Sequence, residues 1–93
     1  MIETLTKYVL VSGMVQGVGY RMGLHHRATA GGVSGWCRNL PDGRVEALLQ
    51  GPEESLEVIL FWCQKGPPNA RVTTLDVSDV QPDEEFQTFE IRR

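Results

Sequence analysis

Apolar segments separated by glycine- and proline-rich connections predict five strands and two helices in this chain. Residues 7–12 (KYVLVS) are apolar on both sides, which is typical of a central strand. Residues 44–50 alternate apolar and polar side chains, which is typical of a half-buried strand. The remaining predicted strands span residues 33–39, 71–80 and 86–92.

Two helices are predicted, at residues 21–30 and 52–65, and the sequence signals for the second are stronger. The second has four apolar residues at i, i+3, i+4 and i+7, which form one apolar face. These residues are Leu56, Ile59, Leu60 and Cys63. The first contains Gly23 and ends near Gly31, and each glycine in a helix costs up to about 1 kcal/mol relative to alanine. We therefore expect the first helix to be the weaker one.

The element order β-α-β-β-α-β-β predicts an α+β fold of the ferredoxin-like type. In this fold two helices cover one face of an antiparallel sheet, here with an additional C-terminal strand. The 93 residues suffice for a single domain, residues 1–93. The first two strands of such a fold point the same way. The glycine-rich loop after the first strand and Asn39 at the end of the second are therefore expected to converge.

Composition and charge argue against several classes of protein. The longest apolar runs fall well short of the roughly 20 residues that cross a bilayer, and residues 1–7 lack the layout of a secretory signal. A cytoplasmic protein without a membrane partner is expected. The net charge of −3 and the scattered Lys and Arg residues argue against nucleic-acid binding, which needs a basic patch. Tyr8 alone does not make the aromatic, basic sheet face of an RNA-binding domain.

The chain offers few groups for metal or covalent chemistry. Its two cysteines, Cys37 and Cys63, are too few for a disulfide scaffold or a zinc site, and fit either buried thiols or one disulfide. Ser12 and Ser34 have no obvious paired base. We expect no metal and no cofactor. Adjacent His25 and His26 point in different directions on a helix and are expected at or near the surface.

Residues 13–21 (GMVQGVGYR) form a glycine-rich loop that leads into the first helix. The N–H groups of such a loop can surround an anion, and the helix dipole adds attraction. Arg21 can pair with two phosphate oxygens. The segment is not a Walker loop, because no Gly-Lys-Ser/Thr follows. Taken alone, it fits equally a simple strand-to-helix connection with a solvated arginine.

Asn39 ends the second predicted strand, just before the turn Leu-Pro-Asp-Gly. Asparagine often occupies turns because its side chain bonds nearby backbone, and Asp42 before Gly43 is explained in the same way. If Asn39 instead lies at the anion loop, its amide oxygen can accept a hydrogen bond from a water molecule and position that water.

Two motifs with matched spacing resemble the signatures of the acylphosphatase family. Residues 13–21 resemble G-x-V-Q-G-V-x-F/Y-R. Residues 35–51 (GWCRNLPDGRVEALLQG) resemble the second signature, an asparagine two residues before a D-G-x-V hairpin. Residues 89–92 (FEIR) resemble the closing strand of the family, so the resemblance covers nearly the whole chain. Gly31, where members often have a large aliphatic residue, is a departure.

The resemblance implies hydrolysis of a small-molecule acyl phosphate to carboxylate and inorganic phosphate, without metal, cofactor or phosphoenzyme. Arg21 resembles the phosphate-binding arginine of the family, and Asn39 the asparagine that orients the attacking water. The residues that resemble the backbone phosphate cradle of the family are Val15, Gln16, Gly17, Val18, Gly19 and Tyr20. Inorganic phosphate is expected as product and competitive inhibitor, and the protein as a monomer. The alternative is a non-catalytic anion- or partner-binding module on the same architecture.

Overall fold

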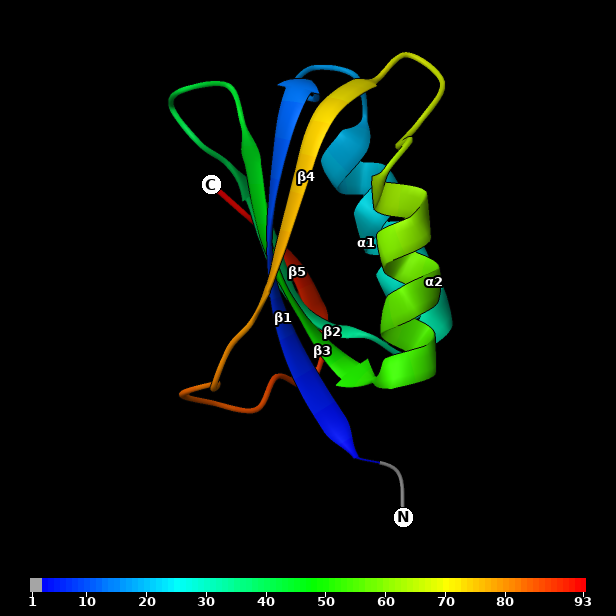
Figure 1. The fold of residues 1–93 in the computed structure, drawn as a ribbon, viewed down its shortest axis with the longest axis vertical. Helices are drawn as coiled ribbons and strands as arrows, with labels where there is room; N and C mark the ends of the chain where they lie inside the picture. Colours follow the sequence, from blue (N-terminus) through cyan, green and yellow to red (C-terminus); the bar gives the residue numbers. More distant parts are fainter. Residues whose placement is uncertain (1–2) are drawn as a thin grey trace.

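Seven elements follow one another in the predicted order in the computed structural model, which describes residues 3–93. They are β1 (Thr4–Met14), α1 (Tyr20–Gly31), β2 (Ser34–Asn39), β3 (Val45–Pro52), α2 (Glu53–Cys63), β4 (Arg71–Asp79) and β5 (Phe89–Arg92). The strands form one sheet in the order β4-β1-β3-β2-β5, and both helices cover the same face (Figure 1). The ferredoxin-like prediction is confirmed.

The sheet is mixed at the edge formed by β5, where an antiparallel sheet was expected. Four strands pair antiparallel, but β5 runs parallel to β2, with Gly35 opposite Phe89 and Arg38 opposite Arg92. The chain leaves β4 at one end of the sheet and crosses to the opposite edge at that same end (Figure 1). The last strand must therefore run back in the direction of β2.

The last strand begins at Phe89, three residues later than predicted. The backbone N–H of Phe86 donates to the side-chain oxygen Oε1 of Gln50 at 2.9 Å, so a side chain holds this part of the chain instead of a strand ladder. The alternation of apolar and polar residues does not show whether a backbone N–H bonds a neighbouring strand or a side chain.

The core lies between the sheet and the helices and is formed by the predicted apolar faces. The sheet contributes the fully buried residues Val9, Val11, Val45, Ala47 and Leu49. From the helices, Leu24, Ala28, Leu56, Ile59 and Cys63 pack against them. Within residues 3–93, no helix is long and apolar enough to cross a membrane.

The ends of β1 and β2 lie at the same end of the sheet. Val11 of β1 and Asn39 of β2 both pair with Val45 of β3, on its two sides. Because both strands run antiparallel to β3, their C-terminal ends point the same way. The loop after β1 and Asn39 are thus brought together, as the predicted topology requires.

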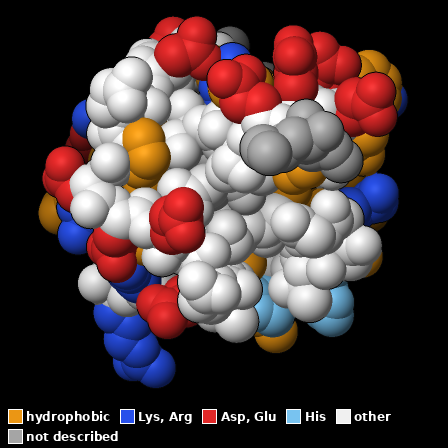
Figure 2. All heavy atoms as spheres, turned by 90° about the horizontal axis from the view of Figure 1, so that it is seen from below, with side chains coloured by type: hydrophobic (Ala, Val, Ile, Leu, Met, Phe, Trp, Pro, Cys, Tyr) orange, Lys and Arg blue, Asp and Glu red, His pale blue; other side chains and the backbone are white. Residues whose placement is uncertain are grey.

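Acidic side chains gather at the other end of the molecule. Figure 2 views that end and shows Asp and Glu side chains along one side of it. Glu3, Glu53 and Glu54 lie together there and line a shallow pocket. These three carboxylates lie at the start of β1, at the opposite end of that strand from the β1–α1 connection.

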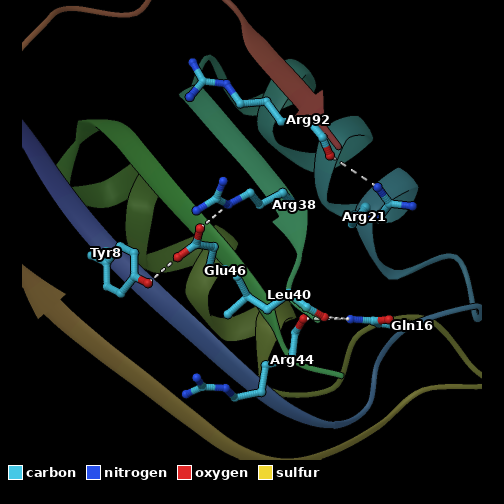
Figure 3. Close-up of polar contacts among 8 residues, drawn as sticks. All are labelled: Tyr8, Gln16, Arg21, Arg38, Leu40, Arg44, Glu46 and Arg92. Carbon is cyan, nitrogen blue, oxygen red and sulfur yellow. Dashed lines mark hydrogen bonds and ion pairs between the residues drawn. The ribbon is translucent and has the colours of Figure 1, made fainter. Parts of the chain in front are cut away.

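The sheet face opposite the helices carries a polar network (Figure 3). The hydroxyl of Tyr8 donates to the Glu46 carboxylate, which also pairs with the Arg38 guanidinium. Burial raises the pKa of Tyr8, and the bond to Glu46 adds to the rise. The Arg38 and Arg92 guanidinium carbons lie 5.6 and 4.9 Å from the Trp36 ring centroid, a stacking arrangement that fastens β5 to β2.

The two glycines within α1 are expected to respond oppositely to alanine. A Cβ at Gly23 would lie 2.7 Å from the Trp62 ring, whereas one at Gly31 would meet nothing within 4 Å. We expect Gly31→Ala to raise the free energy of unfolding by about 0.5–1 kcal/mol through helix propensity. Gly23→Ala should lower it by about 1–3 kcal/mol, because Trp62 must move. Urea denaturation of both variants measures this, and equal stabilisation by the two would contradict a tight Gly23–Trp62 contact.

Candidate active site

A cavity of about 550 Å³ opens where β1 passes into α1. Four of the predicted cradle residues line it, Val15, Gly17, Gly19 and Tyr20, together with Arg21. Met22, Ile91 and Arg93 complete the lining. These three were not predicted, because the meeting of α1 and the last strand leaves no local signal in the sequence.

The backbone of the loop suits an anion. Gly17 and Gly19 have left-handed φ values of 75° and 85°, which glycine adopts at little cost. Gly19 caps α1 without a side chain, so the N–H groups of the first helical turn have no side-chain acceptor. These groups and the positive end of the helix dipole lie at the cavity, and together they attract a phosphate.

Tyr20 anchors the first turn of α1 in the core. Its ring is 1% exposed and lies 5.3 Å from the Trp62 ring, centroid to centroid. Its hydroxyl donates to the backbone oxygen of Cys63 at 2.8 Å. Burial raises the pKa of Tyr20, so the hydroxyl stays a neutral donor. The side chain thus joins the start of α1 to the end of α2, and only the backbone of Tyr20 is left for the cradle.

Arg21 projects from this anchored turn into the cavity. Its Nη1 donates to the backbone oxygen of Arg92 on β5 at 3.4 Å (Figure 3). This bond uses one of the five N–H donors of the guanidinium. Among residues 3–93, the carboxylates that form ion pairs do so with Lys7, Arg38, Arg44 and Arg92, and Arg21 pairs with none. Its charge therefore remains uncompensated beside the cradle.

Asn39 lies at the end of β2 with an unusual environment for its amide. The side-chain oxygen Oδ1 is buried and has no hydrogen-bond partner. Leaving a buried acceptor unpaired costs about 1–3 kcal/mol. Asn39 is not among the residues that line the cavity. Cys37, two residues before Asn39 on the same face of β2, has a pKa that burial raises, and it lies close enough to Arg21 for the guanidinium to offset part of that rise. Arg21 and Asn39 thus share the helix side of the sheet.

The turn after Asn39 is built without the Asn39 side-chain oxygen. The backbone N–H of Leu40 donates to the Arg44 oxygen at 2.8 Å, and that of Gly43 to the Leu40 oxygen at 3.1 Å. Asp42 accepts from the Arg44 backbone N–H at 3.1 Å, which lowers the pKa of its carboxyl. Asp42 therefore bonds the turn backbone, as expected. The Asn39 oxygen Oδ1 makes no such bond, so no hydrogen bond of Oδ1 supports the interpretation of Asn39 as a turn residue.

Two predicted cradle residues do not line the cavity. Val18 packs against the core. The side chain of Gln16 turns toward the β2–β3 connection, where its Nε2 donates to the backbone oxygens of Leu40 at 2.8 Å and Arg44 at 2.9 Å (Figure 3). The predicted cradle uses the backbone of Gln16, whereas its side chain binds the β2–β3 connection.

Both cysteines are buried free thiols. Burial raises the pKa of Cys37 to about 12 and that of Cys63 to about 11, so both stay protonated at neutral pH. A protonated thiol is a poor nucleophile. Over the described range 3–93, no three His, Cys, Asp or Glu side chains gather into a group that could hold a metal ion.

Comparisons with known proteins agree on one family. The acylphosphatase family profile matches residues 7–91. A protein named acylphosphatase from Methylococcus capsulatus is 50% identical over 86 residues, covering 92% of this chain and 94% of its own. Another, from Haloquadratum walsbyi, is 48% identical over the whole of both chains. The crystal structure of acylphosphatase from Bacillus subtilis superimposes with a TM-score of 0.91 at 35% identity, covering 96% of this chain and 99% of that one.

Proposed function

The chain belongs to the acylphosphatase family and is an acyl phosphate hydrolase, and we propose that the cavity between β1, α1 and β5 is its active site. One observation carries this proposal. The cavity coincides with the glycine loop, the open first turn of α1 and the uncompensated charge of Arg21. These are the groups that a phosphoryl group requires.

In the proposed mechanism the phosphoryl group sits in the cradle of Val15–Gly19 and the first turn of α1. Backbone N–H groups and Arg21 bind its oxygens and stabilise the negative charge that spreads over them in the transition state. Met22 and Ile91 are 59% and 37% exposed and border the cavity, so they offer apolar surface to the acyl group.

Asn39 is proposed to hold the attacking water. Its unpartnered Oδ1 accepts a hydrogen bond from one O–H of the water, which leaves an oxygen lone pair directed at phosphorus. The water forms the new P–O bond as the bond between phosphorus and the acyl oxygen breaks. One proton stays on the attacking oxygen, and the other passes to a phosphate oxygen. The products are a carboxylate and inorganic phosphate.

The reaction makes small demands on acid catalysis because the leaving group is a carboxylate. What remains is positioning and charge stabilisation, which dominate phosphoryl transfer. Arg21 and the cradle supply the positive charge that metal ions supply elsewhere. Inorganic phosphate should bind the same groups and inhibit competitively. We expect the enzyme to act as a monomer.

We expect hydrolysis of an aryl acyl phosphate to proceed at an undiminished rate in excess EDTA. Phosphate monoesters should react far more slowly, because their alkoxide or aryloxide leaving groups need protonation. Initial rates with and without chelator, for one substrate of each kind, provide the measurement. A rate restored only by added Mg²⁺ or Zn²⁺ would refute the metal-free mechanism. Phosphate binding without turnover of any acyl phosphate would favour the alternative, a non-catalytic anion-binding module.

A further inference from the structure

Gln16 connects the phosphate cradle to the turn that follows Asn39. Both donors of its side-chain amide are used, one to the Leu40 backbone oxygen at 2.8 Å and one to the Arg44 backbone oxygen at 2.9 Å. The two acceptors are the first and last residues of the β2–β3 turn (Figure 3). One side chain therefore holds both ends of this turn against the loop.

This connection determines where Asn39 stands relative to the cradle. On one side the backbone of Asn39 is paired with Val45 of β3. On the other side it continues directly into Leu40, which Gln16 holds. The catalytic oxygen of Asn39 has no protein partner of its own, so its position depends on the backbone that carries it.

We infer that Gln16 is a positioning residue, which holds the Asn39 hairpin at a fixed distance from the phosphate cradle. The inference rests on the proposed function, because it requires Asn39 to direct the water. An amide suits the task. It presents two donors to two carbonyl oxygens, whereas a carboxylate would be repelled by both and an alkyl chain would bond neither. A displacement of about 1 Å between water and phosphorus can cost about 10²-fold in rate.

Loss of the Gln16 amide should shift the hairpin without unfolding it. The Leu40 oxygen would keep its bond from the Gly43 N–H at 3.1 Å, and the Arg44 oxygen its bond from the Leu40 N–H at 2.8 Å. Neither carbonyl is left without a donor. The variant Gln16→Met keeps nearly the same length and volume and removes both donors, so it isolates the two hydrogen bonds.

We expect Gln16→Met to lower kcat by about 10- to 100-fold on an aryl acyl phosphate. The inhibition constant for inorganic phosphate should stay within about twofold, because the groups that bind phosphate are retained. Unchanged kcat in the folded variant, or a phosphate affinity that falls as far as kcat does, would overturn the inference.

Gln50 provides a matched control at the other end of the sheet. It is 4% exposed, and its Nε2 donates to Thr6 Oγ1 and to the Glu84 backbone oxygen, both at 3.2 Å. It thus clamps a loop as Gln16 does, but away from the cavity, and β5 stays paired with β2 without it. Gln50→Met should lower the thermal midpoint and leave kcat of the folded enzyme unchanged. An equal loss of kcat in the two variants would reduce Gln16 to a general stabilising role and overturn the inference.

A double-mutant cycle with Asn39→Ala tests whether Gln16 acts through Asn39. Residues that act as a unit are not additive, so Gln16→Met should lower kcat by no more than about twofold when Asn39 is already absent. Single-turnover measurements at high enzyme concentration keep these slow rates measurable. The same fold loss in both backgrounds would overturn the inference alone. A wild-type kcat in Asn39→Ala would instead overturn the proposed function of Asn39 and the inference with it.

Discussion

Replacing Arg21 with alanine is expected to remove most acyl phosphate hydrolysis and most phosphate binding together. The guanidinium is the charged group of the cradle, and it is held in place by the buried Tyr20 beside it and by the Arg92 oxygen at 3.4 Å. Deleting one preorganised donor of this kind typically costs about 10²–10³-fold in rate. Inorganic phosphate contacts the same group, so its inhibition constant should rise as well. Initial rates and phosphate inhibition, measured on one folded preparation, check both effects.

Arg27→Ala is the matched control for this substitution. Arg27 lies on the same helix and carries the same charge, but it is exposed and stacks on Trp62, 5.8 Å from the ring centroid. The two variants have equal net charge, so only loss of a local contact can distinguish them. Arg21→Lys should recover little activity, because an ammonium cannot make two parallel bonds to phosphate. A folded Arg21→Ala variant with wild-type phosphate affinity would exclude Arg21 from the site.

Local patterns in the sequence were sufficient to predict most of the fold. The apolar face of α2 needs only residues three and four positions apart, and the hairpin of β2 and β3 needs only a tight turn between two strands. The direction of β5 is different. It depends on which edge of the sheet the chain reaches after β4, and residues 80–88 carry no signal for that choice. The segment before β5 is held at Phe86 by the side chain of Gln50, which lies 36 positions earlier in the sequence.

The candidate site could likewise be predicted only where local patterns and topology determine it. The positions of Arg21 and Asn39 follow from motif spacing and from the topology that joins β1 and β2. The orientation of Gln16 does not follow, because the partners of its side chain lie 24 and 28 positions away. Gly23 was judged a weakness of α1, yet it makes room for the Trp62 ring that packs on Tyr20. A sequence pattern shows the cost of a glycine to the helix, but not the contact that only glycine permits.

Asn39→Ala is expected to separate turnover from binding. An interaction made mainly in the transition state lowers kcat when it is removed and leaves ground-state binding intact. We expect kcat to fall by about 10²-fold or more, because the attacking water would no longer be held in line with phosphorus. The inhibition constant for phosphate should change little, in contrast to Arg21→Ala. Asn39→Asp keeps the shape and adds a negative charge near the bound anion, so it should weaken phosphate binding too.

The stability of the same variant distinguishes this role from a role in the turn. If the Asn39 side chain shaped the turn, its removal should cost about 1 kcal/mol, as for a lost capping bond. In the structure Oδ1 is buried and unpartnered, so alanine removes an unpaired acceptor and should leave the thermal midpoint unchanged or raise it. Asp42→Ala is the control, because Asp42 does bond the turn backbone, and it should lower the midpoint at wild-type kcat. If Asn39→Ala also lowered the thermal midpoint and kept a wild-type kcat, Asn39 would be a turn residue and would have no role in the reaction.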